Sequence, residues 1–153
     1  MKNISALVLL MTAFVINLQA QNLSKKTVHL TAGRAEVSSV FRPKSLTDAD
    51  LVYVYIRKYQ EVSISVSSNS IYFSKENECG MYFRLFDSKG IETKIGDASA
   101  GVDQWSGYVE KAGMFKLRIQ MGCLESFTPK QLNTKKPVFK YNLKIYQPPA
   151  PSR

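Results

Sequence analysis

The residue types that most often carry catalysis or bind metals are scarce in this chain. Its 153 residues include one histidine, His29, and two cysteines, Cys79 and Cys123. A Ser-His-Asp or Cys-His arrangement would have to use that histidine, and no motif places a nucleophile beside it. His29 lies in Val28-His-Leu30, where we predict a first strand that carries the histidine on its surface. The residue types therefore favour a binding protein over an enzyme.

Acidic residues are the remaining candidates for catalysis or metal binding. Glycoside hydrolysis needs two carboxylates that face one cleft. The candidates lie in segments predicted as loops, where carboxylates commonly form turns: Asp48, Asp50, Glu76, Glu78, Asp97 and Asp103. Asp48-Ala-Asp50 is similar to the beginning of a calcium loop, although the glycine and distal glutamate of an EF-hand are missing. We expect no catalytic residue and no cofactor, and we keep Asp48 and Asp50 as candidate calcium ligands.

The first 20 residues have the layout of an export signal. Lys2 precedes an apolar stretch at 6–18, and Ala20 supplies the small residue expected before a cleavage site. The apolar stretch is shorter than the roughly 20 residues that a membrane-spanning helix needs. We predict that residues 1–20 are a cleaved signal peptide, that Gln21 begins the mature chain, and that the protein is periplasmic or secreted without membrane insertion.

Export gives the two cysteines a structural interpretation. In an oxidising compartment an isolated cysteine pair usually forms a disulfide. The alternatives are a two-cysteine metal site and a reactive thiol, for which the sequence supplies neither further ligands nor a histidine partner. Cys79 precedes a predicted strand at 81–86, and Cys123 follows one at 114–121. Antiparallel neighbours would bring these ends together, so we predict that the two strands are adjacent and joined by a Cys79–Cys123 disulfide.

The chain is strongly basic. Lys and Arg number 21 against 12 Asp and Glu, a formal charge of +9, and the mature chain keeps +8 because Lys2 is the one charged residue of the leader. The basic residues are scattered, so we expect no nucleic-acid partner. They form either a solvated face or a surface that attracts an anionic glycan or an acidic protein cleft. The candidate contacts lie in the last strand and the loop before it: Lys130, Lys135, Lys136, Lys140 and Lys144.

A two-residue period dominates the mature chain and predicts strands. Apolar and polar side chains alternate at 62–66 and 139–145, and further strands are predicted at 51–56, 81–86, 105–109 and 114–121, with a tight turn at 87–90. No stretch has a sustained helical period. We predict an all-β, antiparallel, jelly-roll-like β-sandwich at 28–146, a flexible N-terminus at 21–27 and a proline-rich tail at 147–153.

The order of these strands resembles that of a known family. An aromatic strand, a basic turn and Gln60 precede the alternating strand at 62–66. A strand and turn at 81–90, a Trp105-Ser-Gly107 strand, a segment at 112–119 and a closing strand at 139–145 follow. Over residues 28–146 this order resembles the bacterial pre-peptidase C-terminal-like β-sandwich. As a small exported protein made of one such domain, this chain resembles the periplasmic inhibitors of goose-type and invertebrate-type lysozymes.

The resemblance implies a function as well as a fold. Those inhibitors place a Ser-Gly-x-Tyr loop in the lysozyme cleft, and the corresponding residues here are Ala112-Gly113-Met114-Phe115, which keep the glycine and lack both hydroxyls. Tyr59 stands where the family has a turn glycine, and the loop at 122–136 has lysines but no arginine. The resemblance implies a protein partner, a lysozyme, whose cleft is occluded by an inhibitory loop: Glu110, Lys111, Ala112, Gly113 and Met114.

Aromatic residues carry the alternative function. Exposed Tyr53, Tyr55 or Trp105 would serve a carbohydrate-binding or calcium-dependent adhesion module of the cell envelope. We expect Trp105 to anchor the core instead. Phe115 is in register with Leu117 and with Ile119, so we place it in the core as well, which leaves Met114 facing outward.

Overall fold

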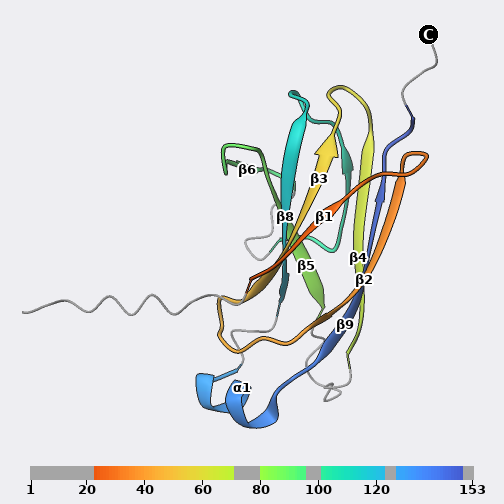
Figure 1. Ribbon diagram of the computed structural model, residues 1–153. Helices are drawn as coiled ribbons and strands as arrows, with labels where there is room; N and C mark the ends of the chain where they lie inside the picture. The colour runs from red at the N-terminus through yellow and green to blue at the C-terminus, as the bar shows by residue number, and fades with distance from the viewer. Residues whose placement is uncertain (1–22, 71–79, 96–100, 123–126, 150–153) are drawn as a thin grey trace, which may run out of the picture.

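Nine strands and one short helix occupy the residues that the computed structural model describes, which are 23–70, 80–95, 101–122 and 127–149. One sheet has the strand order β1-β3-β8-β5-β6 and the other has the order β2-β9-β4-β7. The sheets form two layers around a common core (Figure 1). The predicted β-sandwich class is confirmed.

Strand bounds follow the alternation of apolar and polar side chains. The first sheet consists of β1 (Leu23–Val28), β3 (Ala49–Ile56), β8 (Gly113–Met121), β5 (Met81–Phe86) and β6 (Glu92–Thr93). The second consists of β2 (Arg34–Phe41), β9 (Phe139–Tyr146), β4 (Val62–Ser70) and β7 (Gln104–Gly107). Within β9 the inward Phe139, Tyr141, Leu143 and Ile145 are buried, as the sequence predicts.

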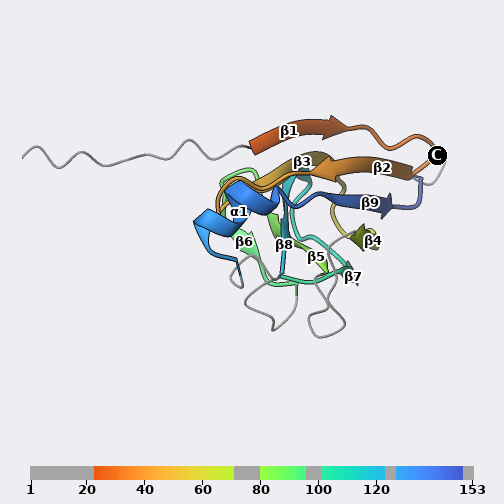
Figure 2. The ribbon, with the colours of Figure 1, turned by 90° about the horizontal axis from the view of Figure 1, so that it is seen from below.

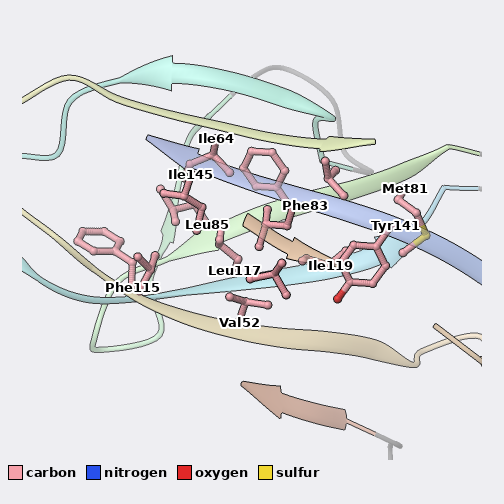
Figure 3. Packing of buried hydrophobic residues seen from close by; sticks show 14 of the residues in the cluster. Val52, Ile64, Met81, Phe83, Leu85, Phe115, Leu117, Ile119, Tyr141 and Ile145 are labelled. Carbon is pink, nitrogen blue, oxygen red and sulfur yellow. The ribbon is translucent and has the colours of Figure 1, made fainter. Parts of the chain in front are cut away.

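The core lies between the two sheets and is built from the inward side chains of each strand. Figure 3 shows Phe115, Leu117 and Ile119 of β8 packed among these side chains. Phe115 is buried and Met114 is exposed, as expected. Full burial of a large apolar side chain stabilises a fold by about 1.5–3 kcal/mol. The two sheets are therefore held together by the residues that give the sequence its two-residue period.

The N-terminal part of the fold differs from the prediction. Residues Leu23–Val28 form β1, which pairs with β3 in parallel, so the predicted flexible N-terminus at 21–27 is wrong from Leu23 onward. The first strand ends at Val28, and His29 follows it in an exposed position. β1 is an edge strand with one neighbour, so its sequence needs few apolar residues and shows no clear alternation. β2, which the sequence analysis did not predict, is also an edge strand.

A short helix lies in the segment that the sequence predicted as a loop. α1 (Pro129–Lys135) is seven residues long, too short to show a helical period. Its signal was local: Thr128 accepts a hydrogen bond from the backbone of Gln131, the Gln131 side chain accepts one from Thr128, and Pro129 occupies the first turn. No helix of the described residues has the length and apolar character needed to cross a membrane.

The beginning of the predicted tail belongs to the fold. Gln147 is 1% exposed, and its backbone N–H donates to the carbonyl of Gly33 at 2.8 Å. Its side chain accepts from Arg57 N at 3.1 Å and donates to Arg57 O at 3.2 Å. The prolines that follow cannot continue a ladder, but the domain extends at least one residue past the predicted boundary.

β5 and β8 are adjacent and antiparallel, with Met81 opposite Met121, as predicted. Cys79 and Cys123 lie outside the described residues. Their neighbours are bonded to each other, because Gly122 N donates to the carbonyl of Gly80 at 2.9 Å. The disulfide therefore stays a prediction. The pairing of β5 with β8 is consistent with it, because that pairing brings the residues next to the two cysteines together.

Candidate functional site

Several turns meet at the end of the sandwich that carries the predicted inhibitory loop. Gly113, the first residue of β8, pairs with Ile56, the last residue of β3, so the turn before β8 lies beside the β3–β4 turn. Asp87, which follows β5, lines one hollow together with Glu110 and Lys111. We call the three turns at 57–61, 87–91 and 108–112, with the strand residues next to them, the aromatic end. It is at the top of Figure 1.

Large hydrophobic side chains are exposed mainly at this end. Of the eight that are exposed among the described residues, five lie there: Tyr55, Tyr59, Ile91, Tyr108 and Met114. Tyr59 is 70% exposed and Tyr108 is 66% exposed. Tyrosine is enriched at protein interfaces because its ring is apolar and its hydroxyl can form hydrogen bonds. The aromatic end therefore has the composition of a contact surface.

Hydrogen bonds fix the turns of the aromatic end to one another. Tyr59 N donates to the carbonyl of Val109 at 3.1 Å and joins the 57–61 turn to the 108–112 turn. Arg57 Nε donates to Gln60 Oε1 at 2.5 Å, and Arg57 Nη2 donates to the carbonyl of Pro148. These contacts fix the backbone of the turns that carry the tyrosines before any partner binds, which lowers the backbone entropy lost on binding.

The third turn is closed by a side chain. Asp87 Oδ1 accepts hydrogen bonds from Lys89 N at 2.9 Å and Ile91 N at 2.8 Å, and Gly90 has a φ of 80°. The tight turn predicted at 87–90 is confirmed. Ile91, 63% exposed, is presented at its end.

Tyr59 has an unusual backbone conformation. Its φ is 55°, in the left-handed region that favours glycine, and its side chain is mostly exposed. A bulky residue there costs about 1–2 kcal/mol relative to an ordinary conformation. Lys58 Nζ lies 5.6 Å from the centre of its ring. Strain at an exposed aromatic residue is more readily explained by binding than by folding.

The predicted inhibitory loop lies in this region with its side chains available. Glu110, Lys111, Ala112 and Met114 are exposed. A Cβ added to Gly113 would meet no atom within 4 Å, and its φ is not positive, so the fold does not require a glycine there. The lysines of this end, Lys58, Lys89 and Lys111, are exposed cations that could face carboxylates of a partner.

The predicted basic contacts are not at this end. Lys130 and Lys135 lie in α1, and Lys136 is its C-cap. Figure 1 shows α1 at the opposite end of the sandwich, past the end of β8, and Figure 2 shows it from that end, in front of the strands. The eight residue steps of β8 from Gly113 to Met121 span about 27 Å. Lys140 and Lys144 are exposed on β9, on the outer face of the four-stranded sheet. The structure thus separates these lysines from the predicted inhibitory loop.

The two candidate calcium ligands are buried and bonded to the protein itself. Asp48 accepts hydrogen bonds from Lys44 N at 2.7 Å, Ser45 N at 3.1 Å and Ser45 Oγ at 2.7 Å, which closes the loop before β3. Asp50 accepts one from the hydroxyl of Tyr141 at 2.8 Å. The described residues contain no group of three or more His, Cys, Asp or Glu side chains that could hold a metal ion.

The Asp50–Tyr141 pair is a polar contact inside the sandwich. Burial raises the pKa of the Asp50 carboxyl, while the hydrogen bond from Tyr141 and the nearby charge of Lys26 act in the opposite direction. Burial raises the pKa of the Tyr141 hydroxyl, and the negative charge of Asp50 raises it further. Figure 3 shows the Tyr141 ring among the core side chains. We interpret the pair as structural, because each group satisfies the other in a buried position.

The aromatic residues of the alternative function are divided between the core and the surface. Trp105 on β7 is half-buried and packs against the core, as expected. Tyr53 and Tyr55 both lie on the outer face of β3, where Tyr53 is half-buried and Tyr55 is 53% exposed. The residues that sequence reasoning missed are Tyr59 and Tyr108. A tyrosine where the resembling family has a turn glycine was the one available signal for Tyr59.

The fold and the aromatic end define a small β-sandwich that presents exposed tyrosines on turns fixed by hydrogen bonds. No protein-family profile matches the chain, and no curated protein matches it either. Several solved structures are similar to the chain. A periplasmic inhibitor of g-type lysozyme from Aeromonas hydrophila is similar, with 14% identity and a TM-score of 0.49, covering 82% of this chain and 98% of the inhibitor.

Two further solved structures are similar to the chain. The Salmonella Typhimurium periplasmic inhibitor of g-type lysozyme has 19% identity and a TM-score of 0.43, covering 80% of this chain and 97% of the inhibitor. The pre-peptidase C-terminal domain of a Bacillus anthracis collagenase has 14% identity and a TM-score of 0.48, covering 84% and 99%. Both kinds of protein that the sequence resembles are therefore among the matches. Identities this low do not transfer a function.

Proposed function

We propose that this chain is an exported binding protein of the lysozyme-inhibitor type, which occludes a glycosidase cleft with its aromatic end. The observation that carries the proposal is the pair of exposed tyrosines, Tyr59 and Tyr108, on two turns joined by the Tyr59 N–Val109 O hydrogen bond. The sequence resemblance supplies the class of target. The predicted signal at 1–20 would deliver the protein to the periplasm or the medium.

The chemistry of the target fits the residues at this end. A glycosidase cleft is lined by carboxylates that flank the scissile bond. Lys58 and Lys111 are exposed on the two joined turns and would pair with such carboxylates, while the tyrosine rings fill the space of sugar units. No chemical step is required of the inhibitor. The basic character of the chain favours an acidic or neutral target over a strongly basic lysozyme.

The division of the basic residues refines the contact surface. The Glu110–Met114 loop is retained in the proposal, with the 57–61 turn added beside it. Lys130, Lys135 and Lys136 lie at the other end, so one cleft cannot take up both sets by simple insertion. Their role in this proposal is limited to long-range attraction, which speeds association without direct contact.

The proposal is tested by inhibition of goose-type, invertebrate-type and chicken-type lysozymes, with gel filtration of each mixture to detect a complex. We expect inhibition and co-elution with at least one of them. Full activity of all three enzymes at an excess of the protein, with no complex, would contradict the proposal.

A further inference from the structure

The outer face of the five-stranded sheet places two arginines side by side. Arg84 of β5 and Arg118 of β8 are directly opposite in the antiparallel register, and both are partly exposed. The Cβ atoms of directly opposite residues lie about 4.5–5.5 Å apart, and like charges in such a pair destabilise a sheet. The pair is therefore unfavourable for folding.

The protein uses only part of the hydrogen-bonding capacity of these arginines. Arg118 Nη2 donates to the carbonyl of Thr47 at 3.0 Å. Arg84 Nε is 3.7 Å from Glu92 Oε1, which is an ion pair but too long for a hydrogen bond. The Nε atoms of both arginines are buried and have no hydrogen-bond partner within the part of the chain that is described. Because these Nε atoms are buried, an external anion would be bound by the Nη groups of the two partly exposed side chains.

Neighbouring residues extend the positive charge along this face. Lys116 is two residues before Arg118 on β8 and therefore on the same face, with its Nζ 4.7 Å from the centre of the Phe86 ring. Lys25 of β1 pairs with Leu51, which pairs with Arg118 in the next strand. On the five strands as described, Glu92 is the one acidic residue of this face, against four cations.

We propose that Arg84, Arg118 and Lys116 bind the sulfate or carboxylate groups of an acidic polysaccharide. A guanidinium group binds either anion through two parallel hydrogen bonds. Tyr53 and Tyr82 lie half-buried on the same face, opposite Lys116 and Gln120, where their hydroxyls can bond to sugar hydroxyls.

The two arginines lie away from the aromatic end, whereas Lys116 borders it and lines one hollow together with Asp87 and Met114. Arg118 lies five residue steps along β8 from Gly113, about 17 Å. Substitution of the two arginines therefore tests the polysaccharide site without changing a residue of the aromatic end.

The test is binding of heparin, which is sulfated, and polygalacturonate, which is carboxylated, by calorimetry, with dextran as the uncharged control. We expect the wild type to bind at least one acidic polymer, with affinity falling as salt rises, and not dextran. Binding of one acidic polymer and not the other identifies the anion. The Arg84→Gln/Arg118→Gln variant should lose at least about tenfold in affinity. The control is Lys140→Gln/Lys144→Gln, which removes the same charge from the other sheet and should lose less than about threefold.

Thermal unfolding separates binding from folding in the same variants. Since the arginines repel each other, the Tm of Arg84→Gln/Arg118→Gln without heparin should be no lower than that of the wild type. Heparin should raise the Tm of the wild type but not that of this variant. An Arg84→Lys/Arg118→Lys variant keeps the charge and should still bind several-fold more weakly, because it lacks the planar donors. Equal losses in the two glutamine variants, full affinity of the lysine variant, equal binding of single-stranded DNA, or no binding of either acidic polymer would overturn the proposal.

Discussion

Replacement of Tyr59 by glycine separates the two interpretations of this residue, structural and functional. The left-handed φ of 55° costs a tyrosine about 1–2 kcal/mol, which glycine would recover. Glycine in turn loses about 0.5–1 kcal/mol through the greater freedom of the unfolded chain. Loss of the exposed Lys58–Tyr59 contact removes about 0.5 kcal/mol more. The contributions nearly cancel, so the free energy of unfolding of Tyr59→Gly should lie within about 1 kcal/mol of the wild-type value, and its Tm within about 5 °C.

Binding should respond differently to the same change. The ring is 70% exposed in the free protein and would be buried in a complex, so its removal should weaken inhibition of the target lysozyme at least about tenfold. Tyr59→Phe keeps the ring and should retain most of the inhibition.

The assay pairs chemical or thermal unfolding with an inhibition titration on each variant. Phe83→Ala provides the scale for a structural aromatic residue, because Phe83 is fully buried and its truncation should cost about 3–5 kcal/mol. A comparable loss in Tyr59→Gly would refute the reasoning, since it would make the ring part of the fold. Undiminished inhibition by Tyr59→Gly would remove Tyr59 from the contact surface.

Three further predictions concern the fold. Gly33→Ala should cost at least about 2 kcal/mol more than Gly90→Ala in urea unfolding, because both glycines have a positive φ but only the Gly33 Cβ would meet Gln147 O, at 2.2 Å; equal costs would argue against this packing. Tyr141→Phe should destabilise by about 1–3 kcal/mol because the buried Asp50 carboxylate loses the hydrogen bond from the Tyr141 hydroxyl. Burial raises the pKa of Tyr141 in the folded state, so its contribution is complete below about pH 10 and is lost as the pH rises further, a dependence that the Phe variant should lack in a pH series of melts. Reduction with dithiothreitol should lower the Tm if Cys79 and Cys123 are joined, and an unchanged Tm together with two titratable thiols before reduction would contradict the disulfide.

Sequence periodicity was sufficient for the central strands and insufficient at the edges of the sheets. β9 and β4 each have two neighbours, so their inward residues must be apolar and the alternation is plain. β1 and β2 are edge strands whose pairing depends on backbone hydrogen bonds, which leave little trace in the residue types. Gln147 was assigned to the tail because its partners, Gly33 and Arg57, are distant in sequence.

The candidate site was predictable in part. The strand pairing that places Gly113 at the end of the sandwich follows from the periodicity, so the position of the Glu110–Met114 loop could be predicted from the sequence. The separation of the lysines was not, because α1 reverses the chain at the far end through a short capped helix without a helical period. The contribution of Tyr59 depends on its φ and on the Tyr59 N–Val109 O hydrogen bond, neither of which a sequence displays.

The most direct test of the central proposal compares the two ends of the sandwich in one inhibition assay. Tyr108→Ala removes an exposed ring from the aromatic end, and Lys130→Gln removes an exposed charge from α1 at the other end. We predict that the wild type and Lys130→Gln inhibit the responsive lysozyme to within about threefold of each other, and that Tyr108→Ala is at least about tenfold weaker. Loss of inhibition in Lys130→Gln with full inhibition by Tyr108→Ala would contradict the account and place the contact surface at α1.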